Sequence, residues 1–293
     1  MEVNGLVLKG IGGFYYVETT NSVIECKAVG KFRNKNISPY PGDRVRVSVD
    51  DNGQGTIIEI EERKNFFQRP TIANIDQLFI VVSASQPVPN VLNIDKMLSI
   101  AEYKGIKSYL VFTKTDLASA KELMQLYKSA GFGVFEISKE DQKQAQDILP
   151  LFKGKISALC GNSGVGKSTL LNELFPDLDL KTSHISQKLG RGRHTTRQTE
   201  LYSAAGGYVA DTPGFSTVDI SRYEIILKDD LADTFPEFRE YADDCMFTGC
   251  SHVKEKGCAV VQAVAEGKIA QSRHESYCAL YEDAKKIKEW ELK

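Results

Sequence analysis

The residues with the most specific chemistry lie in one glycine-rich stretch near the middle of the chain. Residues 161–169 read GNSGVGKST and fit the pattern GxxxxGKS, between an apolar run at 156–160 and leucines at 170, 171 and 174. A loop of this kind, between a strand and a helix, wraps backbone N–H groups around a triphosphate. We therefore expect a nucleotide-binding loop in preference to a chance glycine-rich turn.

The residue types in this loop suit distinct tasks. Glycines are needed wherever a Cβ would obstruct the phosphates or where φ must be positive. Lys167 is expected to reach the β and γ phosphates, and Ser168 to ligate Mg²⁺ at the start of the following helix. The predicted phosphate contacts are Gly161, Asn162, Ser163, Gly164, Val165, Gly166, Lys167, Ser168 and Thr169.

A second motif, at residues 113–116, addresses the base of the nucleotide. It reads TKTD and ends an apolar stretch, which fits the hydrophobic-hydrophobic-x-Lys-x-Asp pattern that reads guanine. The Asp116 carboxylate would accept hydrogen bonds from the ring N–H and the exocyclic amine that only guanine presents together, and adenine would leave it unpaired. Lys114 would lay its alkyl stem along the ring face. A polar turn after a strand is the competing interpretation.

The first position of this motif is usually Asn and is Thr113 here. We therefore expect the hydrogen bond that ties the motif to the phosphate loop to be weaker or differently made. The backbone N–H at Ser138, which ends a further predicted strand, is expected to meet the guanine carbonyl. The predicted base contacts are Thr113, Lys114, Thr115, Asp116 and Ser138.

A third motif, DTPG at residues 211–214, follows a short predicted strand and has the form DxxG. In such a motif Asp211 contacts Mg²⁺ through water and the Gly214 amide senses the γ phosphate. In GTPases of the Ras type the guanine motif follows DxxG, whereas here it precedes the phosphate loop. This order predicts a circular permutation, in which the segment after DxxG leads directly to the C-terminal part of the chain.

That C-terminal part contains three cysteines and a histidine within fourteen residues, at Cys245, Cys250, His252 and Cys258. Three soft thiolates and one imidazole suit tetrahedral Zn²⁺, and four protein ligands without an open position indicate a structural site. The alternative is a set of unligated thiols and a surface histidine. The three isolated cysteines are expected to be buried thiols, and they are Cys26, Cys160 and Cys278.

The elements around these motifs divide the chain into three predicted parts. Residues 1–68 contain expected strands at 2–9, 13–19, 22–28, 44–49 and 55–60, a pattern that predicts a small barrel of the OB type. Within it, the basic residues at 27, 31, 33 and 35 surround Phe32 on one expected connecting segment, which suits nucleic-acid binding or an ordinary solvated loop equally well.

Residues 69–222 are predicted to form the permuted GTPase domain, because strands alternate with helices as in a parallel α/β sheet. Strands are expected at 77–83, 108–113, 133–138, 199–203 and 207–210, and helices at 91–103 and 118–130. Residues 223–293 are predicted to form a helical zinc-binding module, with helices at 224–232, 259–266 and about 272–290. The predicted fold class is therefore a multidomain α/β protein.

The composition is that of an ordinary globular protein, with 293 residues, 42% hydrophobic residues and a net charge of −2. This charge excludes a chain that is basic throughout and allows local basic patches. The first residues, MEVNGLVLKG, lack the pattern of a secretion signal, and no apolar run is long enough to cross a bilayer. We expect a monomeric cytoplasmic protein without membrane contact.

Taken in order, these features resemble one family across essentially the whole chain. A barrel, TKTD, GNSGVGKST, GRGRHTT, DTPGF and the Cys-Cys-His-Cys module together resemble the circularly permuted GTPases of bacterial small ribosomal subunit biogenesis. The resemblance implies a slow GTPase that binds GTP and GDP, depends on Mg²⁺ and is stimulated by the 30S subunit late in its maturation. It also implies that the barrel and the zinc module contact 16S rRNA.

The resemblance further identifies residues 189–197, LGRGRHTTR, as a switch segment. Thr196 is the expected Mg²⁺ ligand there, together with Ser168 and, through water, Asp211. After DxxG a Ras-type enzyme has a glutamine that orients the attacking water, whereas this chain has Phe215. His194 is the expected replacement, with rRNA contact as its alternative role. The predicted catalytic residues are His194, Lys167 and Thr196.

Two functions from other classes compete with this interpretation. An RNA-binding module could use its nucleotide site only as an affinity switch, without turnover. A P-loop kinase of a small metabolite could share the phosphate loop, although TKTD and DTPG argue against that function.

Overall fold

A computed structural model describes residues 1–34, 37–138, 143–176, 199–211 and 224–288. The chain forms two compact units, each assembled from several segments. The first comprises residues 1–77, 145–159 and 167–215, and the second comprises residues 78–144, 160–166 and 216–293. None of the helices in the described ranges is long and apolar enough to span a membrane.

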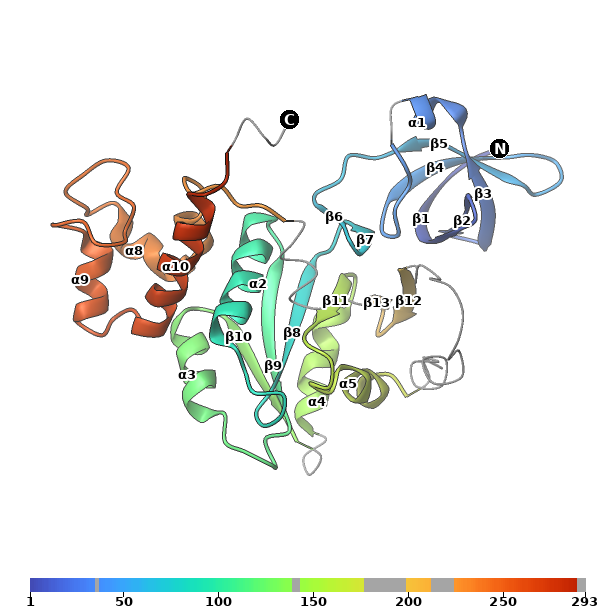
Figure 1. Cartoon of the computed structure of the whole chain (residues 1–293). Helices are drawn as coiled ribbons and strands as arrows, with labels where there is room; N and C mark the ends of the chain where they lie inside the picture. The colour runs from blue at the N-terminus through green and yellow to red at the C-terminus, as the bar shows by residue number, and fades with distance from the viewer. Residues whose placement is uncertain (35–36, 139–142, 177–198, 212–223, 289–293) are drawn as a thin grey trace, which may run out of the picture. The chain divides into compact units, whose positions relative to one another are not determined.

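The first unit begins with a closed barrel, whose strands have the order β1-β2-β3-β5-β4 (Figure 1). Its side chains alternate between core and solvent, as at the start of the Arg44–Val49 strand, where Val45 and Val47 are buried and Arg44 and Arg46 are exposed. The predicted barrel is confirmed with small shifts of its strand ends. The strands are β1 (Glu2–Ile11), β2 (Phe14–Thr19), β3 (Val23–Ala28), β4 (Arg44–Val49) and β5 (Gly55–Ile60).

The single connecting segment expected to carry Phe32 among basic residues differs from the structure. Residues Gly30–Asn34 form a short helix, α1, and Lys27 belongs to β3. Phe32 is only 7% exposed and packs in the barrel core with Val7 and Val45. The barrel needs this ring to fill its end, so Phe32 is not available to stack on a nucleic-acid base.

A six-stranded sheet has the order β10-β9-β8-β11-β13-β12. β9 and β10 are parallel, as are β11 and β13, whereas β12 and β13 form an antiparallel hairpin. The strands are β8 (Gln77–Ser83), β9 (Lys107–Thr113), β10 (Gly133–Ile137), β11 (Ile156–Cys160), β12 (Glu200–Ala204) and β13 (Gly207–Asp211). A small separate sheet pairs β6 (Phe66–Gln68) with β7 (Thr71–Ala73).

The helices between these strands follow the sequence signals closely. The predicted helix at 91–103 is confirmed at both ends as α2 (Val91–Tyr103), where the Asn90 side chain accepts a hydrogen bond from the Asn93 N–H and caps the first turn. The others are α3 (Lys121–Ser129), α4 (Lys143–Ile148), the 3₁₀ turn η1 (Leu149–Phe152) and α5 (Lys167–Leu174).

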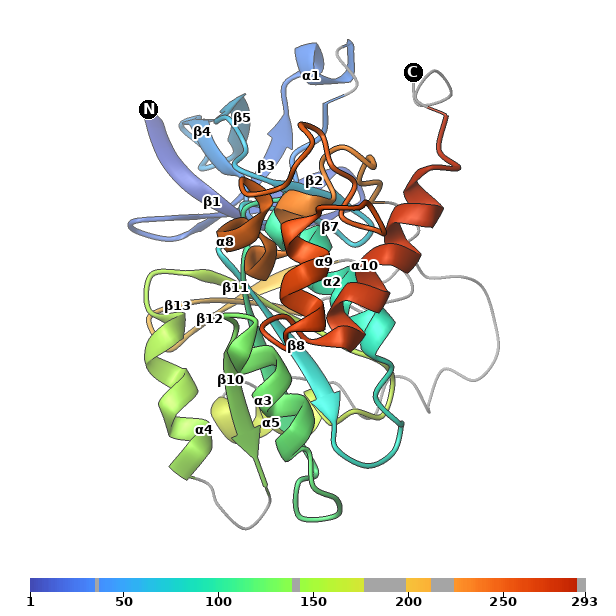
Figure 2. The same cartoon turned by 90° about the vertical axis from the view of Figure 1, so that its left-hand side faces the viewer.

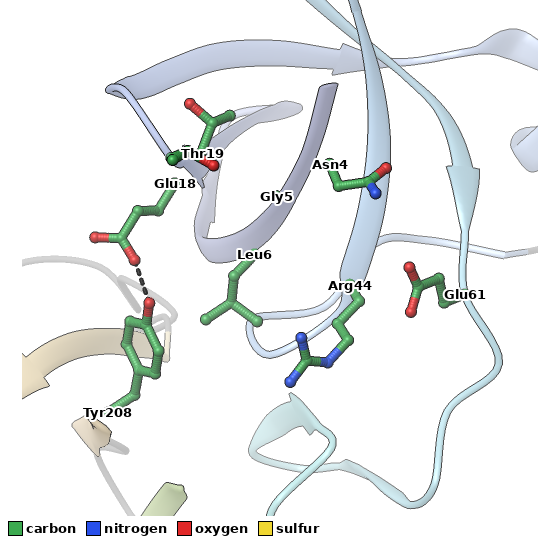
Figure 3. Close-up of a pocket in the computed structure, with 9 residues that line it drawn as sticks. Asn4, Gly5, Leu6, Glu18, Thr19, Arg44, Glu61 and Tyr208 are labelled. Atoms are coloured by element: carbon green, nitrogen blue, oxygen red, sulfur yellow. Dashed lines mark hydrogen bonds between the residues drawn. The ribbon is translucent and has the colours of Figure 1, made fainter. Parts of the chain in front are cut away.

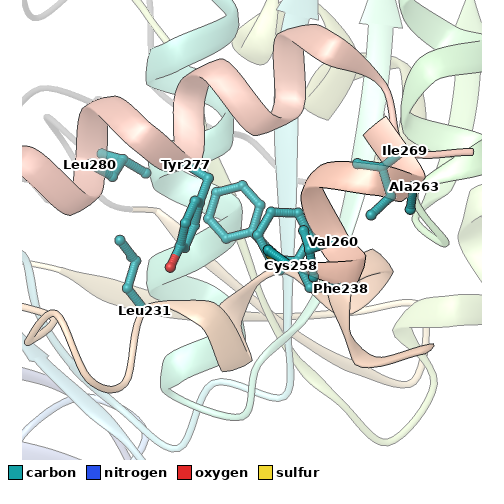
Figure 4. Close-up of a cluster of buried hydrophobic side chains, with 9 residues drawn as sticks. Leu231, Phe238, Cys258, Val260, Ala263, Ile269, Tyr277 and Leu280 are labelled. Carbon is teal, nitrogen blue, oxygen red and sulfur yellow. The ribbon is translucent and has the colours of Figure 1, made fainter. Parts of the chain in front are cut away.

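The C-terminal residues of the second unit form a helical module around an aromatic core. Figure 4 shows Tyr277 and Leu280 meeting Phe238, Cys258 and Val260 in one cluster. The elements are η2 (Ala232–Thr234), η3 (Pro236–Phe238), α8 (Arg239–Ala242), α9 (Ala259–Ala265) and α10 (Gln271–Ala284).

Two expectations for this module are wrong. The predicted helix at 224–232 is not a helix, because its residues are spread to make separate contacts: Glu224 pairs with Lys104 at 2.7 Å, and Leu231 is buried in the module core. The last helix ends at Ala284 and does not reach 290. Trp290 lies outside the described residues.

A buried ion network joins the module to α2 and α3 within the second unit. The Arg273 guanidinium contacts Asp95 of α2 at 2.6 Å and Glu237 at 2.6 Å, and lies over the Phe235 ring. The Tyr127 hydroxyl of α3 donates to the same Asp95 carboxylate at 2.9 Å. Both views of the fold place α10 beside α2 (Figures 1 and 2). Burial alone would lower the pKa of Arg273, but the two carboxylates raise it, so Arg273 remains charged.

Because Arg273 and Asp95 are both almost inaccessible to water, replacing Arg273 leaves two carboxylates without their counter-ion. We predict that Arg273→Met lowers the free energy of unfolding by about 3–5 kcal/mol. The matched control is Arg239→Met, because Arg239 also pairs with a carboxylate of α2, Glu102, but is 60% exposed at its side chain. The control should cost no more than about 1 kcal/mol. Urea unfolding of both variants makes the measurement, and equal losses would contradict a dominant role of the buried network.

Candidate functional site

The phosphate loop has the backbone geometry that its glycines predict. Gly161, Gly164 and Gly166 have φ values of 148°, 82° and 102°. A Cβ on Gly161 would lie 2.5 Å from the carbonyl oxygen of Val81, so no other residue fits there without displacing the β8 backbone. Asn162 is half-buried, Ser163 and Gly164 are exposed, and Val165 is buried, so the loop presents polar atoms outward.

Two side chains of the TKTD motif donate hydrogen bonds to two backbone carbonyl groups of this loop. The Thr113 hydroxyl donates to the Val165 carbonyl at 2.5 Å, and the Lys114 ammonium donates to the Gly164 carbonyl at 2.8 Å. Lys114 also donates to the Gln86 carbonyl, in the segment that follows β8. The tie between the two motifs is therefore differently made, as expected, with a threonine hydroxyl as the donor.

These two contacts set the direction of the loop amides. In a trans peptide the C=O and the following N–H point in opposite directions. Holding the Gly164 and Val165 carbonyls toward the TKTD motif therefore turns the Val165 and Gly166 N–H groups away from it. The Val165 N–H donates to the Asn162 carbonyl at 3.5 Å within the loop, and an outward amide such as that of Gly166 suits an anion.

The remaining residues of the predicted base site lie at the same edge of the sheet. The register pairs Ile137 of β10 with Thr113 of β9, so the residues that follow the two parallel strands emerge together. Ser138 and Thr115 are half-buried, and Asp116 is exposed. The structure thus places Thr113 and Lys114 against residues 161–166, and the residues that follow β9 and β10 at one edge of the sheet.

The first unit contains the other predicted phosphate and magnesium residues. Lys167 begins α5, and Ser168 and Thr169 follow it as exposed residues of the first helical turn. Asp211 is the last residue of β13, paired with Glu200 of β12. His194, Thr196, Gly214 and Phe215 lie outside the described residues, so their roles remain predictions.

The four predicted zinc ligands form one cluster in the helical module. The ligand atoms of Cys245, Cys250, His252 and Cys258 all lie within 4.8 Å of one another. The Cys245 and Cys258 sulfurs are 3.8 Å apart, and each lies 3.5 Å from His252 Nδ1. Zinc bond lengths of about 2.3 Å to sulfur and about 2.0–2.1 Å to nitrogen require tetrahedral edges of about 3.8 Å and about 3.5 Å. The four donors therefore fit a zinc ion in type, and Cys245, His252 and Cys258 also fit it in spacing.

The loop that carries these ligands is organised around Glu255, which sequence reasoning missed. Its carboxylate accepts hydrogen bonds from the N–H groups of Ser251, Val253 and Lys254 at 3.0–3.1 Å and from the Ser251 hydroxyl. Burial opposes its ionisation, but these hydrogen bonds outweigh burial and lower the pKa of Glu255 to about 2. No local sequence signal distinguishes this glutamate from an ordinary loop residue.

Helix α10 supports the same loop from the other side. The Tyr277 hydroxyl donates to the Ser251 carbonyl at 2.7 Å, and His274 Nε2 lies 2.7 Å from the His252 carbonyl. Burial lowers the pKa of His252, which favours the neutral imidazole that binds a metal.

The three isolated cysteines lie outside this cluster. Cys26 and Cys160 are buried as predicted, whereas Cys278 is half-buried beside the His274 ring.

Two family models match the N-terminal barrel and the predicted GTPase domain. Residues 60–221 match the family model described as RsgA GTPase, and residues 4–57 match the model described as RsgA N-terminal domain. Proteins named small ribosomal subunit biogenesis GTPase RsgA are similar over 284 residues. The one from Clostridium perfringens (strain 13 / Type A) is 42% identical, with 96% of this chain and 98% of the relative covered. The one from Clostridium novyi (strain NT) is 43% identical, with 96% and 97% covered.

Two solved structures are similar over nearly the whole chain. The crystal structure of YloQ, described as a circularly permuted GTPase, has a TM-score of 0.82 at 35% identity and covers 98% of this chain and 96% of its own. The crystal structure of YjeQ from Thermotoga maritima has a TM-score of 0.81 at 32% identity, covering 98% of this chain and 100% of its own.

The cluster geometry predicts one zinc ion per chain that depends on all four ligands. We expect Cys250→Ser to lose most of the bound zinc, because a serine hydroxyl is a far weaker ligand than a thiolate. Cys278→Ser is the matched control, since it makes the same substitution in the same module outside the cluster. Elemental analysis of the purified proteins measures the zinc content. Full zinc content in Cys250→Ser, or an equal loss in Cys278→Ser, would exclude this ligand set.

The hydrogen bond from Thr113 to the phosphate loop predicts an effect on nucleotide affinity. Thr113→Val keeps the side-chain shape and removes the donor, so the Val165 carbonyl loses its partner. We expect the affinity for GDP and GTP to fall about 5- to 10-fold, the equivalent of about 1–1.4 kcal/mol. Thr113→Ser restores the hydroxyl and should restore most of the affinity. Titration with a fluorescent guanine nucleotide tests this, and an unchanged affinity in Thr113→Val would show that the tie contributes nothing.

Proposed function

Because the chain belongs to the RsgA family of GTPases, we propose that it hydrolyses GTP on the small (30S) ribosomal subunit late in the maturation of that subunit, and that the subunit stimulates this hydrolysis. The family supports the coarser statement directly: the protein is a GTPase of small-subunit biogenesis. The predicted fold class is also confirmed, with a closed N-terminal barrel, a circularly permuted GTPase domain and a C-terminal Cys/His cluster that could hold zinc.

The observation that carries the proposed nucleotide site is the pair of contacts from Thr113 and Lys114 to the phosphate loop. A base-reading motif and a phosphate-binding loop are useful together only when one nucleotide spans both. In this site Asp116 would accept the two guanine hydrogen bonds, and the loop amides with Lys167 would hold the phosphates. The order of the three motifs along the chain supports the same assignment.

The reaction we propose is GTP + H₂O to GDP + phosphate, with Mg²⁺ bound at the phosphates. When bound there, Mg²⁺ would supply positive charge beside the β and γ oxygens. Ser168, Thr196 and, through water, Asp211 are the residues that would hold it. We propose that His194 orients the attacking water, since Phe215 occupies the position where other GTPases have glutamine and an apolar ring cannot hold water.

The partners we propose follow from the domains. The barrel, assigned to residues 1–68, and the zinc module, assigned to residues 223–293, would contact 16S rRNA, with the GTPase domain of residues 69–222 between them in the chain. We propose that the protein acts as a monomer in the cytoplasm, where ribosomal subunits are assembled. A zinc ion at the Cys245 cluster would hold the loop that the module presents.

Phosphate release with and without 30S subunits tests this function. We expect stimulation of the wild type by the subunit, and we expect His194→Ala to lose at least about 10-fold of the stimulated turnover while it keeps GTP affinity and subunit binding. If His194→Ala keeps its turnover on the subunit, this histidine does not orient the attacking water. Binding of the subunit without any phosphate release would instead favour an RNA-binding module with a nucleotide switch, and competition by ATP as effective as that by GDP would favour a kinase.

A further inference from the structure

The barrel touches the β12–β13 hairpin through two polar contacts inside the first unit. Lys9 of β1 pairs with Glu200 of β12 at 2.6 Å, with side chains 29% and 31% exposed. The Tyr208 hydroxyl of β13 donates to the Glu18 carboxylate of β2, as Figure 3 shows. Each strand of the hairpin is therefore fastened to a different strand of the barrel.

The register of the hairpin shows that both contacts are made close to Asp211. Glu200 is paired directly with Asp211 across the two strands, and Tyr208 lies three residues before Asp211 on the same strand. On its other side β13 pairs with β11 only as far as Ala210, opposite Ala158, so at Asp211 itself the ladder partner is Glu200 of β12. Lys9 holds that partner, and Glu18 holds the strand itself.

The junction is polar and partly open, unlike the attachment of the helical module. A pocket of about 380 Å³ borders it, lined by barrel residues that include Asn4, Leu6 and Arg44 and closed on one side by Tyr208 (Figure 3). Burial and the neighbouring Glu18 carboxylate raise the pKa of Tyr208 to about 12, so its hydroxyl remains a donor at physiological pH. The two contacts that join the barrel to the hairpin here are made by individual polar side chains.

We propose that Glu200 and Tyr208 are positioning residues for GTP hydrolysis: through Lys9 and Glu18 the barrel holds the β12–β13 hairpin and thereby sets the position of Asp211. The barrel is then part of the hydrolytic machinery in addition to any contact with RNA. This inference rests on the proposed function, in which Asp211 contacts Mg²⁺ through water. The residues named act through the backbone of Asp211 and touch neither nucleotide nor metal.

The Mg²⁺ dependence of turnover separates this role from a merely structural one. A misplaced Asp211 weakens the hold on Mg²⁺ and lowers kcat, whereas the base-reading residues and the 161–166 loop belong to the second unit and keep their nucleotide contacts. A variant that only lost stability would show neither change at a temperature where it is fully folded. The KM for GTP at saturating Mg²⁺ should therefore stay constant while the half-saturating Mg²⁺ concentration rises.

The experiment uses a charge exchange in the full-length protein with 30S subunits and GTP. Lys9→Glu places two carboxylates together, and we expect kcat to fall and the half-saturating Mg²⁺ concentration to rise, each at least about fivefold. The double variant Lys9→Glu/Glu200→Lys restores an ion pair and should return both values to within about twofold of the wild type. A failure of the double variant to recover either value would overturn the proposal.

A substitution that removes a single hydroxyl tests the same role if the charge-exchange variant does not fold. Tyr208→Phe removes one oxygen, and we expect it to change both values about two- to threefold in the same direction. Tyr16→Phe is the matched control, because the Tyr16 hydroxyl donates to Glu25 at 3.0 Å in a pair of the same chemistry that stays within the barrel. Thermal unfolding of both variants shows that they are folded at the assay temperature.

The possible results separate a failure of the positioning role from a failure of the proposed GTPase function. If the wild type and Tyr16→Phe hydrolyse GTP while Tyr208→Phe and Lys9→Glu match them in kcat and Mg²⁺ dependence, the positioning role is wrong and the GTPase function stands. If the wild type releases no phosphate with 30S subunits, both are wrong.

Discussion

The direction of two peptide groups, those that follow Gly164 and Val165, is the constraint on which the nucleotide site depends. Their carbonyls accept hydrogen bonds from Lys114 and Thr113, and their N–H groups must therefore face the opposite way. The glycines are needed for the same reason: the backbone can turn its amides outward only with positive φ, and at Gly161 only without a Cβ. The TKTD motif thus shapes residues 161–166, the predicted phosphate loop, through these two contacts.

The helical module and the barrel are attached to their neighbours by different kinds of interaction. The helical module is fixed to α2 by a fully buried guanidinium between two carboxylates, beside an aromatic core. Losing such a pair leaves uncompensated charge in the interior, so the attachment is nearly all-or-none. The barrel meets β12 and β13 through half-exposed polar contacts beside an open pocket. Contacts of that kind exchange readily with water, so they suit a part that responds to a bound partner.

Sequence patterns predicted those features whose cause is local. Helix α2 is correct to the residue because Asn90 caps it and its apolar residues recur at helical spacing. The cluster that could hold a metal ion was predicted because its four residues lie within fourteen positions. The errors have long-range causes. In the sequence Phe32 stands among basic residues, but in the folded barrel it packs in the core. Residues 224–232 do not form a helix, because they contact α2 and the module core instead.

The residues that sequence reasoning missed form pairs that are distant in the chain. Arg273 is 178 residues from Asp95, and Lys9 is 191 residues from Glu200, so no spacing rule could connect them. Glu255 is close to its partners, but a carboxylate that accepts four hydrogen bonds from its own loop has the same local sequence as a solvated one. Such groups become visible only when the fold shows which donors face them.

The permuted order also has a mechanical consequence that the structure modifies. The chain runs from Asp211 through residues 212–223 directly into the helical module, which suggests that a change after DxxG would move the module as a body. The module is anchored elsewhere, however: Glu224 pairs with Lys104 at the end of α2, with both side chains only 15–16% exposed, and Arg273 holds α10 to the same helix. Moving the module away from α2 would require breaking both contacts. On the positioning role proposed for Glu200 and Tyr208, nucleotide state would act more easily on the barrel side, where partly exposed polar contacts join the hairpin of Asp211 to the barrel.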